Sequence, residues 1–176
     1  PMKSKKNYYK IKTIAFTLIL LISNYSFAKN KILLPPGNNN CSGSIPLPVN
    51  SDETCTNSTT VTFTQATTST EGDNCTSQNG ADVWYEFTAT STSQTISLSN
   101  FTGTAQPMVI VLYDGNCGSL TQLSCSQNNV LNATNLTIGE VYKIKIYFNT
   151  SAPSLSNTLD VCITTPPPPS GNNQTD

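Results

Sequence analysis

Two stretches of the sequence decide the fold: residues 82–89 read DVWYEFTA, and residues 141–148 read VYKIKIYF. Both show the period of two that is typical of a half-buried β-strand, with apolar side chains on one face and polar ones on the other. In the second stretch, Lys143 and Lys145 share one face. Because a buried lysine is costly, that face should point outward. The side chains of the other face should then point to the core, and these are Tyr142, Ile144, Ile146 and Phe148.

The same reasoning orients residues 82–89. Glu86 should face outward, and Trp84 lies two residues before it, so the single tryptophan of the chain should share the outer face. Residues 108–113 (MVIVLY) are apolar on both faces. This pattern is typical of a central strand that is well covered on both sides.

Similar short segments recur along the chain between turn signals such as Asp114-Gly115 and Gly139, at the spacing expected of a sandwich or a barrel. The predicted fold class is all-β: a single domain of about eight or nine short, mostly antiparallel strands, stapled by disulfides. The predicted strands are residues 44–49, 60–64, 82–89, 95–101, 108–113, 120–124, 130–136, 141–148 and 159–164.

The first 28 residues are predicted to be an export signal. Five lysines form a positive head, residues 13–22 (TIAFTLILLI) form an apolar run, and Ser26-Phe27-Ala28 is the small-x-small pattern that precedes cleavage. The apolar run is roughly half of what a membrane-spanning helix needs, which disfavours an anchor. The protein is therefore expected to be secreted, outside the cell or at its surface.

Three further parts follow the export signal. Residues 29–40 should form a tether, residues 41–165 a β-sandwich domain, and residues 166–176 a proline-rich linker. Similar segments rich in proline, glycine and asparagine precede and follow the domain. Either the second segment is the start of a truncated next module, or the two are alike only because linkers often share this composition. In the first case, further domains are covalently linked in the full-length protein.

Charge and composition exclude several classes of function. After cleavage, four lysines remain against ten acids, which gives a net charge of −6, and the chain has neither arginine nor histidine. Such a chain is a poor partner for nucleic acid or for an anionic membrane surface. Without histidine it has no Ser-His-Asp triad, and no glycine-rich phosphate loop is present. An enzyme is not expected.

The six cysteines should form three disulfides, because the chain is predicted to be exported to an oxidising compartment. One predicted bridge closes a short hairpin-like segment, one joins the two ends of the domain, and one takes the remaining cysteines. In that order, the predicted pairs are Cys117–Cys125, Cys41–Cys162 and Cys55–Cys75.

The ordered set of motifs resembles the pre-peptidase C-terminal (PPC) family of β-sandwich modules, in the cysteine-rich version of secreted multidomain proteins from Bacteroidetes-type bacteria. The resemblance implies a single jelly-roll-like β-sandwich, a non-catalytic module attached to secreted peptidases or adhesins. Some relatives of this module bind collagen or polysaccharide, and some bind calcium. The resemblance rests on residues 38–45 (NNNCSGSI), 82–89, 94–98 (QTISL), 111–114 (VLYD), 136–146 (LTIGEVYKIKI) and 159–163 (LDVCI).

Two candidate sites follow from the residues. If the chain binds calcium, Glu71, Asp73 and Asp82 are the first ligand candidates, since one loop could bring them together; the alternative is that such residues only form turns. No other cofactor is implied. A ligand could instead bind on the predicted outer face, provided that residues 141–148 pair beside residues 82–89. The residues of that face are Trp84, Glu86, Lys143, Lys145 and Tyr147.

For the outer face, two other interpretations stay open: cross-strand packing with a Lys–Glu pair, or a loop that covers Trp84. The leading hypothesis is a binding or adhesion module for a polysaccharide or an extracellular protein. The second is a structural spacer without a ligand. The third is a glycosidase that uses Asp82 with Glu86, or Asp114 with Asp160. The first of these carboxylate pairs lies about 13 Å apart by strand rise, which is longer than glycosidases use.

Overall fold

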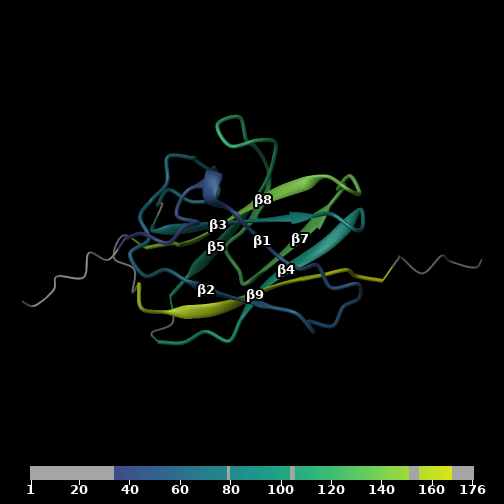
Figure 1. Cartoon of the computed structure of the whole chain (residues 1–176), viewed down its shortest axis with the longest axis horizontal. Coiled ribbons are helices and arrows are strands. Elements are labelled where there is room, and N and C mark those ends of the chain that lie inside the picture. The colour runs from purple at the N-terminus through teal and green to yellow at the C-terminus, as the bar shows by residue number, and fades with distance from the viewer. Residues whose placement is uncertain (1–33, 79, 104–105, 151–154, 168–176) are drawn as a thin grey trace, which may run out of the picture. The chain divides into compact units, whose positions relative to one another are not determined.

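The computed structural model describes residues 34–78, 80–103, 106–150 and 155–167 (Figure 1). The predicted export signal lies outside the described residues, as do residues 29–33 of the predicted tether and residues 168–176 of the predicted linker. Among the described residues, no helix is long and apolar enough to cross a membrane.

The described chain is all-β, apart from one short 3-10 turn, η1 (Cys41–Gly43). All nine predicted strands are present, with bounds shifted by a few residues. They are β1 (Ile45–Pro46), β2 (Thr59–Thr62), β3 (Asp82–Thr88), β4 (Ser93–Ser99), β5 (Met108–Asp114), β6 (Thr121–Ser126), β7 (Val130–Thr134), β8 (Val141–Phe148) and β9 (Thr158–Thr164).

These strands form two sheets that face each other (Figure 1). The five-stranded sheet has the order β1-β3-β8-β5-β6, and the four-stranded sheet has the order β2-β9-β4-β7. Every pairing of neighbouring strands is antiparallel except that of β1 with β3. The predicted β-sandwich is therefore confirmed. The turn after β5 is also where the sequence placed it: Gly115 has a φ of +94°, which a glycine adopts without strain.

The predicted orientation of the two deciding strands is correct. β3 pairs with β8, and Glu86 lies directly opposite Lys143. The inner faces of β3, β8 and β5 supply apolar residues to one continuous core between the sheets, which the four-stranded sheet completes with residues such as Ile96 and Val161. This core is what a two-layer sandwich needs to bury one face of each sheet.

Much of the outer face of the five-stranded sheet is also buried, as in the alternative interpretation in which a loop covers Trp84. A second apolar cluster lies there, formed by Trp84, the β5 residues Val109, Val111 and Tyr113, and Tyr147. Trp84 has no exposed surface. Residues 38–41 and the β2–β3 loop cover this face, so Trp84 is on the predicted side of the sheet but is not exposed. Asn38 and Asn39, expected in a tether, are buried parts of the domain.

All six cysteines form disulfides, but the three predicted pairs are wrong. Cys117 does not pair with Cys125, because Cys117 lies in the turn before β6 and Cys125 lies near the far end of that strand, which carries the chain away at about 3.3 Å per residue. Cys41 cannot reach Cys162, because they lie on the outer faces of opposite sheets. Cys55 cannot reach Cys75 for the same reason. The observed pairs are Cys41–Cys117, Cys55–Cys162 and Cys75–Cys125.

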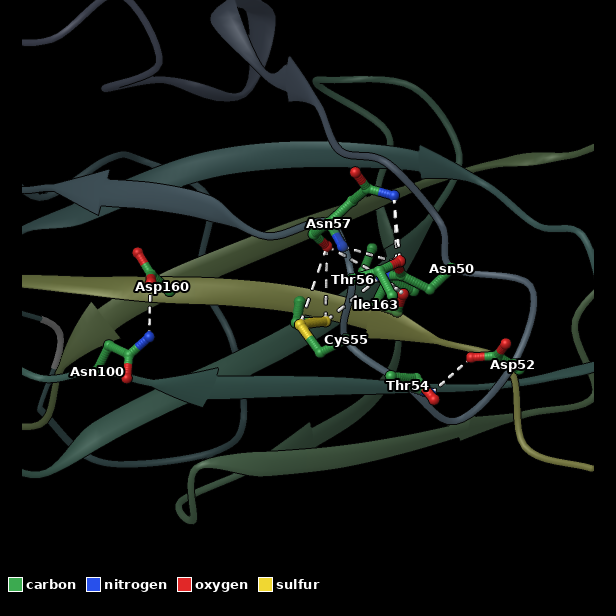
Figure 2. Close-up of a disulfide and its surroundings, with 10 residues drawn as sticks. Asn50, Asp52, Thr54, Cys55, Thr56, Asn57, Asn100, Asp160 and Ile163 are labelled. Atoms are coloured by element: carbon green, nitrogen blue, oxygen red, sulfur yellow. Dashed lines mark hydrogen bonds between the residues drawn. A yellow bond between two sulfur atoms is a disulfide. The ribbon is translucent and has the colours of Figure 1, made fainter.

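The Cys55–Cys162 disulfide fixes the β1–β2 loop to the outer face of the four-stranded sheet (Figure 2). Beside it, the buried side chain of Asn50 donates to the carbonyl oxygens of Asn57 and Ile163 and accepts from Thr56. The asparagine thus supplies the hydrogen bonds that the buried loop backbone needs. The disulfide then closes a segment of 107 residues, the longest of the three.

Candidate functional site

The outer face predicted to bind a ligand is closed by a polar network. Trp84 stacks on Tyr113 with ring centroids 5.5 Å apart, and its indole N–H donates to Asp82 and to the Ser69 hydroxyl. Ser69 in turn donates to Asp82 from its backbone and its hydroxyl. Burial raises the pKa of the Asp82 carboxyl above its ordinary value, although these hydrogen bonds and the charge of Lys145 act to lower it.

A buried ion pair lies beside this network. Lys145 Nζ is 3.0 Å from Asp73 Oδ2, and neither side chain has exposed surface. Lys145 also donates to the carbonyl oxygen of Glu71, at 2.8 Å. The Tyr147 hydroxyl donates to Asp73 Oδ1. Trp84, Lys145 and Tyr147 are therefore brought close together as predicted, but they hold a loop on the sheet and are not open to a ligand.

The three predicted calcium ligands do not form a cation site. Asp73 forms an ion pair with Lys145, and Asp82 accepts hydrogen bonds from Ser69 and Trp84. Glu71 contacts the same lysine through its backbone oxygen. Within the described part of the chain, no group of three or more acidic, cysteine or histidine residues could hold a metal ion. The ammonium group of Lys145 already bonds to the Asp73 carboxylate and to the Glu71 backbone oxygen.

The remaining residues of the predicted face form an ion pair at its edge. Lys143 contacts the Glu86 carboxylate, and the Ser44 hydroxyl bonds to both partners. The hydrogen bonds from Lys143 and Ser44 hold the pKa of Glu86 below its ordinary value. This is the Lys–Glu pair of the alternative interpretation. It is partly exposed, so it contributes little to stability.

An open cleft of about 300 Å³ lies next to the closed network. Thr70, Glu71 and Gly72 of the β2–β3 loop form one wall, and Gly118 and Leu120 of the β5–β6 turn form the other. The floor is the edge of Tyr113, whose hydroxyl donates to the Gly72 carbonyl oxygen at 3.1 Å.

Both walls of the cleft are fixed to the rest of the domain. The Cys75–Cys125 disulfide ties down the loop that carries Glu71, and Lys145 and Tyr113 bond to its backbone. The Cys41–Cys117 disulfide ties down the opposite turn. The cleft is therefore preformed, and a ligand would bind without an entropic cost for ordering the walls.

The residues that line the cleft supply hydrogen-bond acceptors, and none of them carries a positive charge. Among the residues that the structure describes, the Glu71 side chain has a hydrogen bond only from the Thr70 hydroxyl, at 3.4 Å, so its carboxylate is available to a ligand. Both lysines of the described chain, Lys143 and Lys145, are held in ion pairs elsewhere. A carboxylate beside a hydroxyl binds neutral hydroxyl donors well and repels anions. Of the cleft residues, only Glu71 was a candidate site residue from the sequence, and it was a candidate calcium ligand.

The match to known families extends over most of the domain. Residues 37–161 match a T9SS-associated family described as galactose binding domain-like. The chain belongs to this family. The membership confirms the predicted β-sandwich and its Bacteroidetes type, whereas the assignment to the PPC family is not confirmed. No curated protein and no solved structure matches the chain. The T9SS association and the three disulfides point to an extracellular or cell-surface protein.

Neither carboxylate pair of the glycosidase alternative is formed. Asp82 is buried against Ser69 and Trp84, while Glu86 is held by Lys143 at the edge of the same sheet. Asp114 ends β5 in one sheet, and Asp160 belongs to β9 in the other. Retaining and inverting glycosidases both need two carboxyl groups that flank one bond, which these positions do not supply.

Proposed function

We propose that the chain is a secreted, non-catalytic glycan-binding module of a larger extracellular or cell-surface protein, with the cleft beside Glu71 as its binding site. The single observation that carries the proposal is a preformed cleft that presents a carboxylate and a hydroxyl in a family described as galactose binding domain-like. The likeness to PPC modules supports the same accessory role.

The charge of the cleft narrows the ligand class. Sugar hydroxyls donate to the Glu71 carboxylate and accept from Thr70, and a pyranose ring packs against Leu120 and the edge of Tyr113. Because the cleft contains an acid and no base, uronic acids and sulfated sugars are disfavoured. The favoured ligands are neutral glycans, among which galactose-terminated ones are the first to test.

The proposal is tested by replacing Glu71 with glutamine, which keeps the shape of the side chain and removes its charge. We expect binding to neutral glycans on an array to weaken about tenfold or more, because hydrogen bonds to charged groups contribute about 1.5–3 kcal/mol. Glu140→Gln is the matched control, since Glu140 is an exposed acid outside the cleft. The proposal fails if the folded wild type binds no glycan, or if both variants bind as the wild type does.

A second candidate function, a structural spacer, is favoured by where the described chain begins and ends. Asn38 bonds to Trp84 near the start of β3, whereas Thr164 pairs with Thr95 near the start of β4, and β4 begins shortly after the far end of β3. Such modules line up end to end when they are linked in series. A spacer predicts no glycan binding at all, so the array separates the two functions.

A further inference from the structure

The Lys145–Asp73 pair has the features of a site for covalent cross-linking. Both side chains are fully buried, and Nζ of the lysine is 3.0 Å from Oδ2 of the aspartate. Their environment is aromatic: Nζ lies 4.9 Å from the centre of the Tyr147 ring, and Trp84 and Tyr113 belong to the same cluster. Both charges of this buried pair have lost their hydration, so converting the pair into a neutral amide removes that desolvation cost.

The other oxygen of Asp73 is held in a different way. Oδ1 accepts one hydrogen bond from the Tyr147 hydroxyl and another from the backbone N–H of Cys75, each 3.0 Å long. Two donors on one carboxyl oxygen are the arrangement that stabilises an oxyanion in acyl transfer. Burial raises the pKa of the Tyr147 phenol, so this donor keeps its proton.

We propose that Lys145 and Asp73 condense spontaneously in the folded protein to form an intramolecular isopeptide bond. One proton first passes from Nζ of Lys145 to Oδ2 of Asp73, which leaves a neutral amine beside a neutral carboxylic acid. Nζ then attacks Cγ of Asp73, with the developing negative charge on Oδ1 held by Tyr147 and the Cys75 N–H, and a second proton passes from Nζ to Oδ2. The Cγ–Oδ2 bond then breaks, and Oδ2 leaves as water.

The reaction is balanced without a further reactant. The ammonium group carries three protons and the carboxylate none; two protons leave with Oδ2 as water, and one stays on the amide nitrogen. No electron is gained or lost, and both buried charges disappear. The product joins the β2–β3 loop to β8 by a bond that reduction cannot break.

The loop is held in position for this step. Cys75, two residues after Asp73, is tied to Cys125 of β6, and Lys145 donates a second hydrogen bond to the carbonyl oxygen of Glu71. The amine and the carboxyl group therefore have few other positions to adopt. Holding reacting groups in contact lowers a large part of the barrier to a reaction between them.

The experiment is mass spectrometry of the secreted, folded protein after reduction and alkylation of its disulfides. We expect the wild type to be lighter than its sequence by one water, and its digest to contain a branched peptide that joins residues 73 and 145. Lys145→Arg should have the full sequence mass. Asp73→Asn should lose one ammonia in place of water and reach the same final mass as the wild type, because the product is identical.

Three results would overturn the proposal. One is a wild type of full sequence mass after prolonged incubation in the folded state. Another is recovery of Asp73 and Lys145 only in linear peptides, a result that does not depend on whether any variant folds. The third is a loss of water that persists in Lys145→Arg, which would assign the loss to another site such as Asp114-Gly115.

Discussion

Replacing Asp73 with alanine is expected to lower the free energy of unfolding by about 3–5 kcal/mol, because it leaves the buried Lys145 charge without a partner. The loss also frees the loop that covers Trp84, since Asp73 is the acceptor for Tyr147 as well. The measurement is urea unfolding followed by the fluorescence of Trp84, which should become more exposed in the variant.

Two further variants make this test specific. Glu53→Ala removes an exposed acid and should change stability by less than about 0.5 kcal/mol. The double variant Asp73→Ala/Lys145→Met removes both charges and should be more stable than Asp73→Ala alone. The account of the outer face is wrong if Asp73→Ala is as stable as Glu53→Ala.

Removing the Cys55–Cys162 disulfide, with both cysteines changed to alanine, is expected to cost about 4–5 kcal/mol. This bridge closes 107 residues, whereas Cys75–Cys125 closes 50, so the loop-entropy model gives it the larger effect. The expected difference between the two bridges is below about 1 kcal/mol. The comparison needs unfolding curves for both double variants under identical conditions.

Peptide mapping without reduction checks the connectivity on which this second prediction depends. It should give peptides that join Cys55 to Cys162, Cys41 to Cys117 and Cys75 to Cys125. A peptide joining Cys117 to Cys125 would contradict the structure. A cost below about 1 kcal/mol for the Cys55–Cys162 pair would show that the β1–β2 loop is held by other contacts, such as those of Asn50.

The fold could be predicted from the sequence because each strand has a local signal, either alternating polarity or flanking turn residues. Alternation in β3 and β8 gave the correct inner faces, and the turn signals gave nine strands close to the observed ones. These features depend only on neighbours along the chain. Disulfide pairing depends on which sheet and which face each cysteine reaches. The order of strands in the two sheets determines which face each cysteine reaches. This strand order could not be predicted from the spacing of the cysteines in the sequence.

A loop over Trp84 was left as one of several interpretations of the outer face, because Lys145 and Glu86 were both interpreted as exposed. The direction of their side chains was correct, but a loop of turn-forming residues covers one of them and leaves the other at the edge. One signal was available. The strand of residues 108–113 is apolar on both faces, so the outer side of its sheet needed a cover, and Trp84 lies on that side.

The cleft could not be predicted from the sequence, because its two walls lie far apart in the chain. Glu71 and Gly118 come together only when two disulfides and the Lys145–Asp73 pair hold their loops on the same sheet. Thr70 and Gly118 have no local pattern that separates them from ordinary turn residues. The binding site is therefore a property of the tertiary structure.

The most direct test of the central claim, that this cleft binds a neutral glycan, is a titration of the folded module with galactose-terminated oligosaccharides followed by its two-dimensional amide NMR spectrum. The account predicts saturable shifts that concentrate on residues 70–72 and 118–120, on the two walls of the cleft. Saturable shifts elsewhere on the sandwich, or no shift with any neutral glycan, would contradict it.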